Sequence, residues 1–319
     1  MSKKNDGKAK FNHGKKSLEL DPVFIDPALL PRDQTGILES MGIKLIPEPE
    51  FKELARIIYD HFGINLTPNK LTLVTGRIHP IMVNHGFKTY SDYIETLKLD
   101  KSGEMISELA NHISTNHTAF YREESHFKLL QSTVLPEITE RKRKVGDRDL
   151  RVWCAACSTG EEAYTLEFCL LRHFAREYDI WKAGVLATDI SASALAKAKA
   201  GIYPAARMES VPLDIQYDYF TRVDNENFAV VPKVKKEVTF RRLNLMNERY
   251  PLKKAFDIIF CRNVMIYFDH NTRIQLIERL YHWIEPEGYL FIGHSESVPG
   301  LDKMFTYVSP SVYKSRKGE

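Results

Sequence analysis

Five short, mostly apolar runs of β-prone residues recur through the second half of this sequence, and helical patterns separate most of them. The runs lie at residues 150–154, 184–188, 238–240, 256–260 and 289–292. Helical spacing of apolar residues marks the intervening segments 161–176 and 272–283. Strands that alternate with helices favour a parallel sheet covered by helices on both faces. The pattern therefore predicts an α/β, Rossmann-like domain over residues 150–319.

The segment before this domain has a helical pattern of its own. Apolar residues from Phe51 to Phe62 recur at helical spacing, and Gly63 supplies a stop. Thr67 followed by Pro68 is typical of the start of a second helix, and two further helical patterns follow. We expect an all-α domain at residues 49–113 and a linker helix within residues 114–149.

Two other segments depart from these patterns. Residues 1–48 mix lysines with proline and show no sustained periodicity, which predicts a flexible extension. Residues 203–237 interrupt the alternation of strands and helices, and we expect a small inserted β-subdomain there. Within it we expect residues 228–231 to pair with residues 234–238 as a hairpin.

The composition is that of an ordinary soluble protein. Of the 319 residues, 43% are hydrophobic, which is enough to bury the cores of two domains. No apolar run approaches the roughly 20 residues that span a bilayer, and the lysine-rich start lacks a signal-peptide pattern. We therefore expect a cytoplasmic protein without membrane insertion. A net charge of +3 is too small to indicate nucleic-acid binding.

The turn after the first predicted strand carries two consecutive carboxylates. Ligands of a doubly wound sheet bind beyond the carboxyl ends of the strands, where this turn lies. With Gly160 as its one glycine, the turn does not match the G-x-G-x-x-G fingerprint, and Glu161 and Glu162 would repel a pyrophosphate. A cationic ligand such as S-adenosylmethionine, with its sulfonium and ammonium groups, suits the turn better. Alternatively, both glutamates only complement the helix N-terminus.

Two later strand ends add candidate ligand contacts. The second predicted strand ends at Asp189, whose carboxylate can accept hydrogen bonds from both ribose hydroxyl groups of a nucleoside. Asp189 can equally cap a helix that begins near Ser191. Asn244 and Leu245 follow the third strand and can meet an adenine ring with a polar edge and an apolar face.

Five segments resemble the signature blocks of the CheR family of chemotaxis protein-glutamate O-methyltransferases, and they occur in the family's order. They are STNHTAFYRE (114–123), AACSTGEEAY (155–164), ATDI (187–190), FCRNVMIYF (260–268) and GHSE (293–296). The resemblance extends from about residue 49 to the C-terminus. It implies an all-α domain, then a class I S-adenosylmethionine methyltransferase domain with a β-subdomain inserted near residues 203–237.

The resemblance also implies the site residues. The implied contacts to S-adenosylmethionine are Asn116, Thr118, Arg122, Glu161, Glu162, Asp189, Asn244, Leu245, Arg262 and Asn263. Arg122 can pair with the methionine carboxylate, and one of the two glutamates can balance the ammonium group. The sequence does not decide between Glu161 and Glu162. Arg262 and Tyr267 are the candidates for orienting the reacting groups.

The implied reaction forms methyl esters on glutamate side chains of chemotaxis receptors. A glutamate with a pKa near about 4.3 is already ionised at neutral pH, so no general base is required. Some family members grip a C-terminal pentapeptide tether of the receptor with a glycine-rich hairpin, and residues 222–228 lack those glycines. We therefore expect a monomer that docks on the acidic cytoplasmic helical domain of a receptor without the tether. Basic side chains of the all-α domain or of residues 141–144 are the candidates for that contact.

Other functions remain as alternatives or are excluded. A nucleic-acid methyltransferase would share the sheet and cofactor, but the chain has no Asp/Asn-Pro-Pro-Tyr-like motif. A non-catalytic protein that binds the cofactor and regulates a partner would keep the same motifs. We expect no metal site, because neither the four cysteines nor His112, His117 and His126 have convincing ligand spacing. A hydrolase is excluded, because residues 293–297 end in serine where a nucleophile elbow needs glycine.

Overall fold

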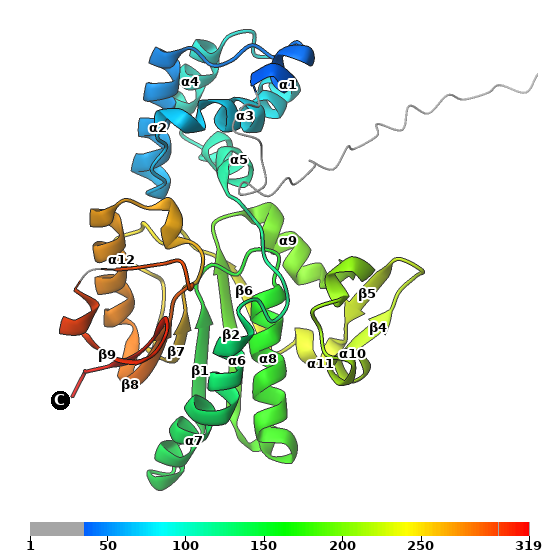
Figure 1. The fold of residues 1–319 in the computed structure, drawn as a ribbon, viewed down its shortest axis with the longest axis vertical. Helices are drawn as coiled ribbons and strands as arrows, with labels where there is room; N and C mark the ends of the chain where they lie inside the picture. Colours follow the sequence, from blue (N-terminus) through cyan, green and yellow to red (C-terminus); the bar gives the residue numbers. More distant parts are fainter. Residues whose placement is uncertain (1–34, 299, 319) are drawn as a thin grey trace, which may run out of the picture.

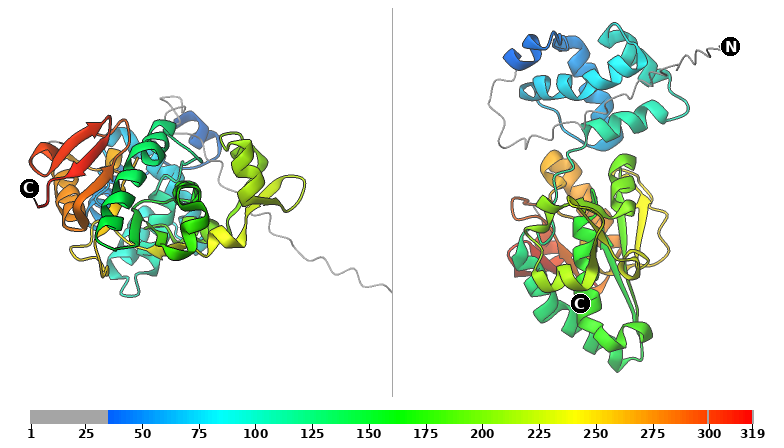
Figure 2. Two further views of the ribbon diagram at one scale, coloured as in Figure 1. Left: turned by 90° about the horizontal axis from the view of Figure 1, so that it is seen from below. Right: turned by 90° about the vertical axis from the view of Figure 1, so that its right-hand side faces the viewer.

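The computed structural model describes residues 35–298 and 300–318 as two bodies stacked end to end. A helical body formed by α1 to α5 lies above a larger body built on a sheet, and residues 114–123 join them (Figure 1). Figure 2 shows the same stacking from the side. None of the described helices combines the length and the apolar character needed to cross a bilayer.

The helical body has its own apolar core. Its helices are α1 (Thr35–Ser40), α2 (Glu48–Phe62), α3 (Leu71–His85), α4 (Tyr90–Leu99) and α5 (Glu104–Ile113). Leu54, Ile78 and Leu109, from three different helices, are buried together. Gly63 ends α2 in the left-handed conformation with φ of 69°. A 3₁₀ turn, Pro68–Lys70, leads into α3.

Part of the segment predicted as a flexible extension is folded into this body. Residues 1–34 lie outside the described residues. Residues 35–48 contain α1 and bury Leu38, Ile43 and Ile46, and the Ile46 N–H donates to Thr75 Oγ1 at 3.2 Å. The prediction was wrong for residues 35–48, because a few isolated apolar residues that pack on a neighbouring domain leave no periodic signal.

A seven-stranded sheet forms the centre of the larger body, in the order β6-β2-β1-β7-β8-β10-β9. The strands are β1 (Asp149–Cys154), β2 (Lys182–Asp189), β6 (Val238–Arg242), β7 (Phe256–Phe260), β8 (Ile284–Phe291), β9 (Phe305–Ser309) and β10 (Val312–Ser315). The first five are parallel, and β10 runs antiparallel to its neighbours β8 and β9. The strand order reverses between β1 and β7, which is the point where doubly wound sheets bind ligands.

Side chains of the central strands alternate between two apolar cores. Val152 and Cys154 of β1 face the core shared with α6 (Glu124–Leu129), α7 (Leu135–Lys144) and α8 (Glu161–Phe174). A π-helical turn, Leu130–Val134, joins α6 to α7. Trp153 faces the other core, shared with α12 (His270–His282). Because helices cover both faces, the predicted doubly wound α/β fold is confirmed.

A small antiparallel sheet projects from the side of the larger body after α9 (Ala192–Ala200) (Figure 1). It contains β3 (Ile202–Pro204), β4 (Phe220–Arg222) and β5 (Asn227–Val230), with β5 in the middle. The short helices α10 (Leu213–Tyr219) and α11 (Pro232–Lys235) flank it.

The predicted hairpin inside this segment was wrong. The strand β5 pairs with β4 and β3, whereas Val238 belongs to β6 and pairs with Val185 in the main sheet. Pro232 explains the difference, because proline has no N–H for a strand ladder and begins the helical turn of α11 instead. The terminal hairpin of β9 and β10 was not predicted at all.

Candidate functional site

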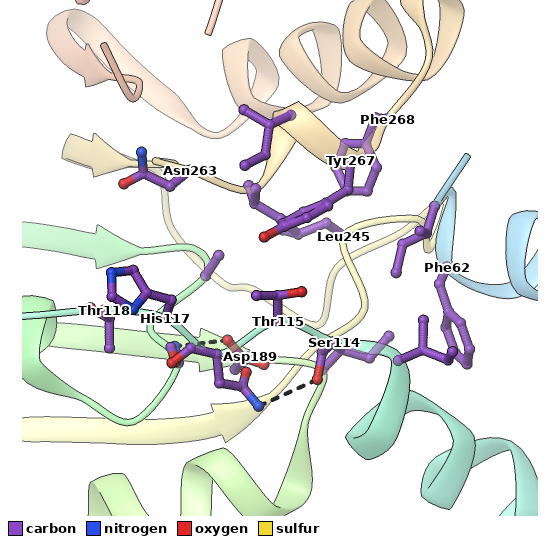
Figure 3. Close-up of a pocket in the computed structure, with 18 of the residues that line it drawn as sticks. Phe62, Ser114, Thr115, His117, Thr118, Asp189, Leu245, Asn263, Tyr267 and Phe268 are labelled. Atoms are coloured by element: carbon purple, nitrogen blue, oxygen red, sulfur yellow. Dashed lines mark hydrogen bonds between the residues drawn. The ribbon is translucent and has the colours of Figure 1, made fainter. Parts of the chain in front are cut away.

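A cavity of about 630 Å³ lies between the two bodies, beyond the carboxyl ends of the parallel strands. The helical body contributes Phe62, Arg77 and Ile113 to its wall, and the joining segment contributes residues 114–118. The sheet body contributes the turns after β1, β2, β6 and β7. Figure 3 shows Asp189, Leu245 and Tyr267 around the same cavity. The volume lies within the range of about 300–1,000 Å³ that is typical of small-molecule sites.

Every predicted site residue except Glu161 lines this cavity. The lining residues among them are Asn116, Thr118, Arg122, Glu162, Asp189, Asn244, Leu245, Arg262, Asn263 and Tyr267. They come from segments that are widely separated in the sequence. The fold therefore places site residues from separate sequence motifs around one cavity.

The two consecutive glutamates have different surroundings. Glu162 Oε2 accepts a hydrogen bond from Arg262 Nη1 at 2.7 Å, and Glu162 lines the cavity. Glu161 turns away and accepts a hydrogen bond from Thr159 Oγ1 at 2.6 Å, with Arg207 Nη1 3.7 Å from its other oxygen. Burial raises the pKa of Glu161 above its usual value. Glu162 is therefore the carboxylate that a ligand in the cavity meets.

Asp189 accepts hydrogen bonds from the turn after β1 and does not cap a helix. Its two carboxylate oxygens accept hydrogen bonds from Ser158 N at 2.8 Å and Ser191 N at 2.9 Å. The cap of α9 is Ser191, whose hydroxyl oxygen accepts from Ala194 N at 3.1 Å. Burial raises the pKa of Asp189, and the two backbone N–H groups partly offset that effect.

Arg262 is fully buried, and carboxylates hold its guanidinium from two sides. Its Nη1 contacts Glu162 at 2.7 Å, and its Nη2 lies 2.9 Å from Glu123 Oε2. Nη2 also donates to the carbonyl of Arg122 at 2.6 Å. The aromatic rings of Phe127 and Phe260 lie 5.5 and 5.8 Å from the guanidinium carbon. Both terminal nitrogens of Arg262 are thus engaged with groups around the cavity, whereas its buried Nε has no hydrogen-bond partner.

Asn244 and Tyr267 both connect the cavity wall to the helical body. Asn244 Nδ2 donates to the carbonyl of His61 at 2.6 Å, and its Oδ1 accepts from Met246 N at 2.9 Å. The Tyr267 carbonyl accepts from Asn65 N at 2.9 Å. Each amide atom of Asn244 thus makes one hydrogen bond within the protein, and each keeps a second position for a ligand in the cavity that Asn244 lines. Leu245, beside it, supplies an apolar wall.

Two protein-family models match the chain in sequence order. One, described as "CheR methyltransferase, all-alpha domain", matches residues 49–114, and one described as "CheR methyltransferase, SAM binding domain" matches residues 116–314. The chain belongs to the CheR methyltransferase family. A chemotaxis protein methyltransferase of Borreliella burgdorferi is 40% identical over 269 residues, which cover 84% of this chain and 95% of that protein. A chemotaxis protein methyltransferase of Escherichia coli is 33% identical over 293 residues, which cover 90% and 98%.

As a member of this family, the chain is a methyltransferase that uses S-adenosylmethionine. The cavity between the two bodies suits that cofactor. The buried Asp189 presents a carboxylate at the end of β2, where nucleoside ribose groups bind in related folds. Glu162 and Arg122 supply opposite charges for an ammonium and a carboxylate group. When it is bound, S-adenosylmethionine supplies an electrophilic methyl group on a sulfonium.

Two further residues in the sequence blocks typical of the family hold groups at the cavity wall, and they were not nominated from the sequence. Glu296 is buried, and its carboxylate accepts from the N–H groups of Gly293, Asn263 and Met265 at 2.6, 3.0 and 2.7 Å. Glu123 accepts from Asn263 Nδ2 at 3.1 Å as well as pairing with Arg262. Their position inside the GHSE and STNHTAFYRE blocks was the available signal.

The basic run at residues 141–144 lies far from the cavity between the two bodies. It forms the end of α7, at the opposite end of the sheet from the helical body (Figure 1). All four side chains have acidic partners: Arg141 pairs with Glu287, Lys142 with Asp147 and Asp257, Arg143 with Glu177, and Lys144 with Glu140. Both observations argue against this run as the docking surface for a substrate protein.

Proposed function

We propose that this enzyme transfers the methyl group of S-adenosylmethionine to glutamate carboxylates on the cytoplasmic helical domain of chemotaxis receptors. The charge of the cavity is the observation that carries the proposal. Its charged lining residues are Lys70, Arg77, Arg122, Arg262, Glu162 and Asp189. Four cationic side chains therefore face two carboxylates, Glu162 and Asp189. A site with this excess of positive charge attracts an anionic nucleophile.

The chemistry needs few catalytic groups. An ionised carboxylate is a competent nucleophile at neutral pH, and its oxygen can displace a sulfonium sulfur from a methyl carbon without losing a proton first. The protein's contribution is to hold the oxygen in line with that carbon and to exclude water. The apolar wall formed by Phe62, Leu245 and Phe268 supports that exclusion.

We assign the cofactor contacts as follows. Asp189 would accept from the ribose hydroxyl groups, and Arg122 would pair with the methionine carboxylate. Glu162 would balance the ammonium group, because Glu161 faces away from the cavity. Arg262 acts as a positioning residue through its contacts to Glu162 and Glu123. Tyr267, from the turn Met265–Tyr267, would border the substrate carboxylate.

Docking without a receptor tether is the form of recognition that the β-subdomain favours. The turn between β4 and β5 contains no glycine, and Asp224 closes it instead. Its Oδ1 accepts from Glu226 N and Asn227 N, both at 2.8 Å. Docking would therefore rest on basic side chains of the helical body beside the cavity, such as Lys70.

The test is methyl transfer from labelled cofactor to a cytoplasmic receptor fragment. We expect base-labile label in the receptor with the wild type, and its loss with Asp189→Ala and Arg122→Ala. Base-stable label would indicate nitrogen methylation. Label in RNA but not in the receptor would favour a nucleic-acid methyltransferase. Cofactor binding without turnover on either substrate would favour the non-catalytic alternative.

The same assay tests the docking proposal. A receptor fragment that lacks its last five residues should be methylated at the same rate as the complete fragment. A large loss of rate on truncation would show that the tether is used after all.

A further inference from the structure

Glu123, His126 and His294 form a compact cluster beside the cofactor cavity. His126 Nδ1 lies 3.5 Å from Glu123 Oε2, and His294 Nε2 lies 4.0 Å from the same oxygen. The two imidazole rings meet edge to face, with centroids 4.5 Å apart. Within residues 35–298 and 300–318 this is the cluster of histidine, cysteine and carboxylate side chains whose ligand atoms, all within 4.8 Å of one another, suit a metal ion.

The buried imidazole of His126 faces two hydrogen-bond acceptors, the Pro310 carbonyl and the Glu123 carboxylate, but a neutral ring has only one N–H to donate. Its Nε2 lies 3.4 Å from the carbonyl of Pro310, and its Nδ1 faces the Glu123 carboxylate. A neutral ring carries a proton on one nitrogen only. If that proton is on Nε2 and donates to Pro310, the lone pair of Nδ1 points at a carboxylate oxygen. Nδ1 has no hydrogen-bond partner, although His126 is only 2% exposed.

A second proton would satisfy both contacts, but the surroundings oppose it. Burial, Arg262 and His294 together lower the pKa of His126 to about 4, against the raising effects of Glu123 and the Pro310 carbonyl. Because a carbonyl oxygen can only accept, the contact of Nε2 with Pro310 places the proton on Nε2 and leaves Nδ1 as an acceptor without a partner. A neutral imidazole whose far N–H donates to a backbone carbonyl is the usual state of a histidine metal ligand.

We propose that Glu123, His126 and His294 bind a divalent transition-metal ion of the zinc class. The ligand atoms would be Glu123 Oε2, His126 Nδ1 and His294 Nε2, and the His294 side chain is half-exposed, so solvent can reach the cluster from its side. Two imidazoles and one carboxylate are a common ligand set for zinc. Ligands at about 2.0–2.2 Å in a tetrahedral site lie about 3.3–3.6 Å apart. The 3.5 Å contact already has this spacing, and rotation of the His294 side chain closes the longer one.

The local charge permits a cation next to Arg262. The guanidinium lies 2.9 Å from the ligand oxygen of Glu123, which by itself would repel a metal ion. Glu162 also pairs with Arg262, so the guanidinium is shared between two carboxylates and does not neutralise Glu123 alone. Glu123 Oε2 also accepts from the backbone N–H of His294 at 3.1 Å, and His294 Nε2 lies 3.3 Å from Ser125 Oγ. The ion would replace these two contacts and sit between His126 Nδ1 and the Glu123 carboxylate.

The site would connect a metal ion to the wall of the cofactor cavity. Glu123 directly follows Arg122 in the chain, and its other oxygen accepts from Asn263 Nδ2 at 3.1 Å. A metal ion bound to the Glu123 carboxylate would therefore change its contacts with Asn263 and Arg262, which line the cavity. The inference concerns binding, however, and stands apart from the choice of methyl acceptor.

Cobalt(II) is a suitable probe, because its visible absorption reports tetrahedral coordination. We expect the metal-free full chain to take up one equivalent of Co²⁺ with intense visible bands, and Zn²⁺ to displace it. His294→Ala, at a half-exposed position, should weaken binding by at least about tenfold. His126→Gln should do the same. His85→Ala is the matched control, because His85 pairs with Glu108 at 2.7 Å but has no second histidine in that pair.

Three outcomes would overturn the proposal. These are absent cobalt bands in the wild type, bands that persist unchanged in His294→Ala, and bands lost equally in His85→Ala. If His126→Gln fails to fold, nitrogen NMR of the wild-type imidazoles decides instead. A His126 Nδ1 signal that stays unchanged when Zn²⁺ is added would mean that this nitrogen does not bind the metal ion.

Discussion

Replacing the two adjacent glutamates one at a time should separate their roles. Glu162→Gln removes the charge that faces the cavity and that pairs with Arg262 at 2.7 Å. Loss of a charge-assisted contact to the cofactor's ammonium group costs about 1.5–3 kcal/mol, which corresponds to an affinity about 10- to 100-fold weaker. Glu161→Gln removes a carboxylate that burial already disfavours, and its amide oxygen can still accept from Thr159. We expect the cofactor affinity of Glu161→Gln to stay within about twofold of wild type.

The two variants should also differ in stability. Breaking a buried ion pair costs about 3–5 kcal/mol when the remaining charge has no other partner. Arg262 keeps Glu123 at 2.9 Å, so the cost for Glu162→Gln should lie at or below about 3 kcal/mol and leave the protein folded. Glu161→Gln should be neutral or slightly stabilising, since it buries no charge.

Isothermal titration with S-adenosylhomocysteine measures the affinities, and urea unfolding measures the stabilities. A Glu161→Gln variant that loses cofactor affinity as strongly as Glu162→Gln would refute the assignment. So would a Glu162→Gln variant that binds the cofactor like the wild type while remaining folded.

Three further variants test other parts of the structure. Asp189→Asn keeps one acceptor for two backbone N–H groups and should weaken S-adenosylhomocysteine binding about 10- to 100-fold by titration; an unchanged affinity would contradict the assigned contact. Burial raises the pKa of Glu167 from 4.5 to about 8. The folded state therefore binds this proton more tightly than the unfolded state, and the free energy of unfolding is highest below about pH 4.5. It should fall by at most about 5 kcal/mol as the pH rises from about 4.5 through 8. Glu167→Gln should remove this slope in urea unfolding between pH 5 and 8.5, and a persistent slope would place it on another group. Arg143→Glu with Lys144→Glu should leave receptor methylation within about twofold, and a large loss would restore the basic run as a docking surface.

The strands and the ligand end of the sheet were predictable, because they follow from local composition. Four of the five residues at 256–260 are apolar, and all five are buried. Asp189 was found because the position after a parallel strand is where such sheets bind ligands. Glu161 and Glu162 could not be told apart, since consecutive residues of a helix point about 100° from each other and the sequence gives no absolute direction.

What the sequence could not provide were contacts between distant segments. His126 was judged by its spacing to His112 and His117, whereas the structure places it against His294. Asn244 was nominated as a ligand contact, and the structure adds a contact that the sequence did not indicate, because its amide also donates to the carbonyl of His61 in α2. In each case the side chain's chemistry was clear and its partner was not.

The backbone around the cavity shows why these polar contacts are needed. Tyr121, Glu123, Ser158 and Asn263 are non-glycine residues with φ between 49° and 58°, a conformation that costs about 1–2 kcal/mol each. Each lies in or next to the cavity wall, and buried polar groups hold three of them: Arg262 holds Glu123, Asp189 holds the N–H of Ser158, and Glu296 holds the N–H of Asn263. Asp189 therefore faces the cavity and also keeps a strained turn in place. Cofactor affinity and local stability are coupled at this residue for a physical reason, because the carboxylate that would meet the ribose is the one that fixes the turn.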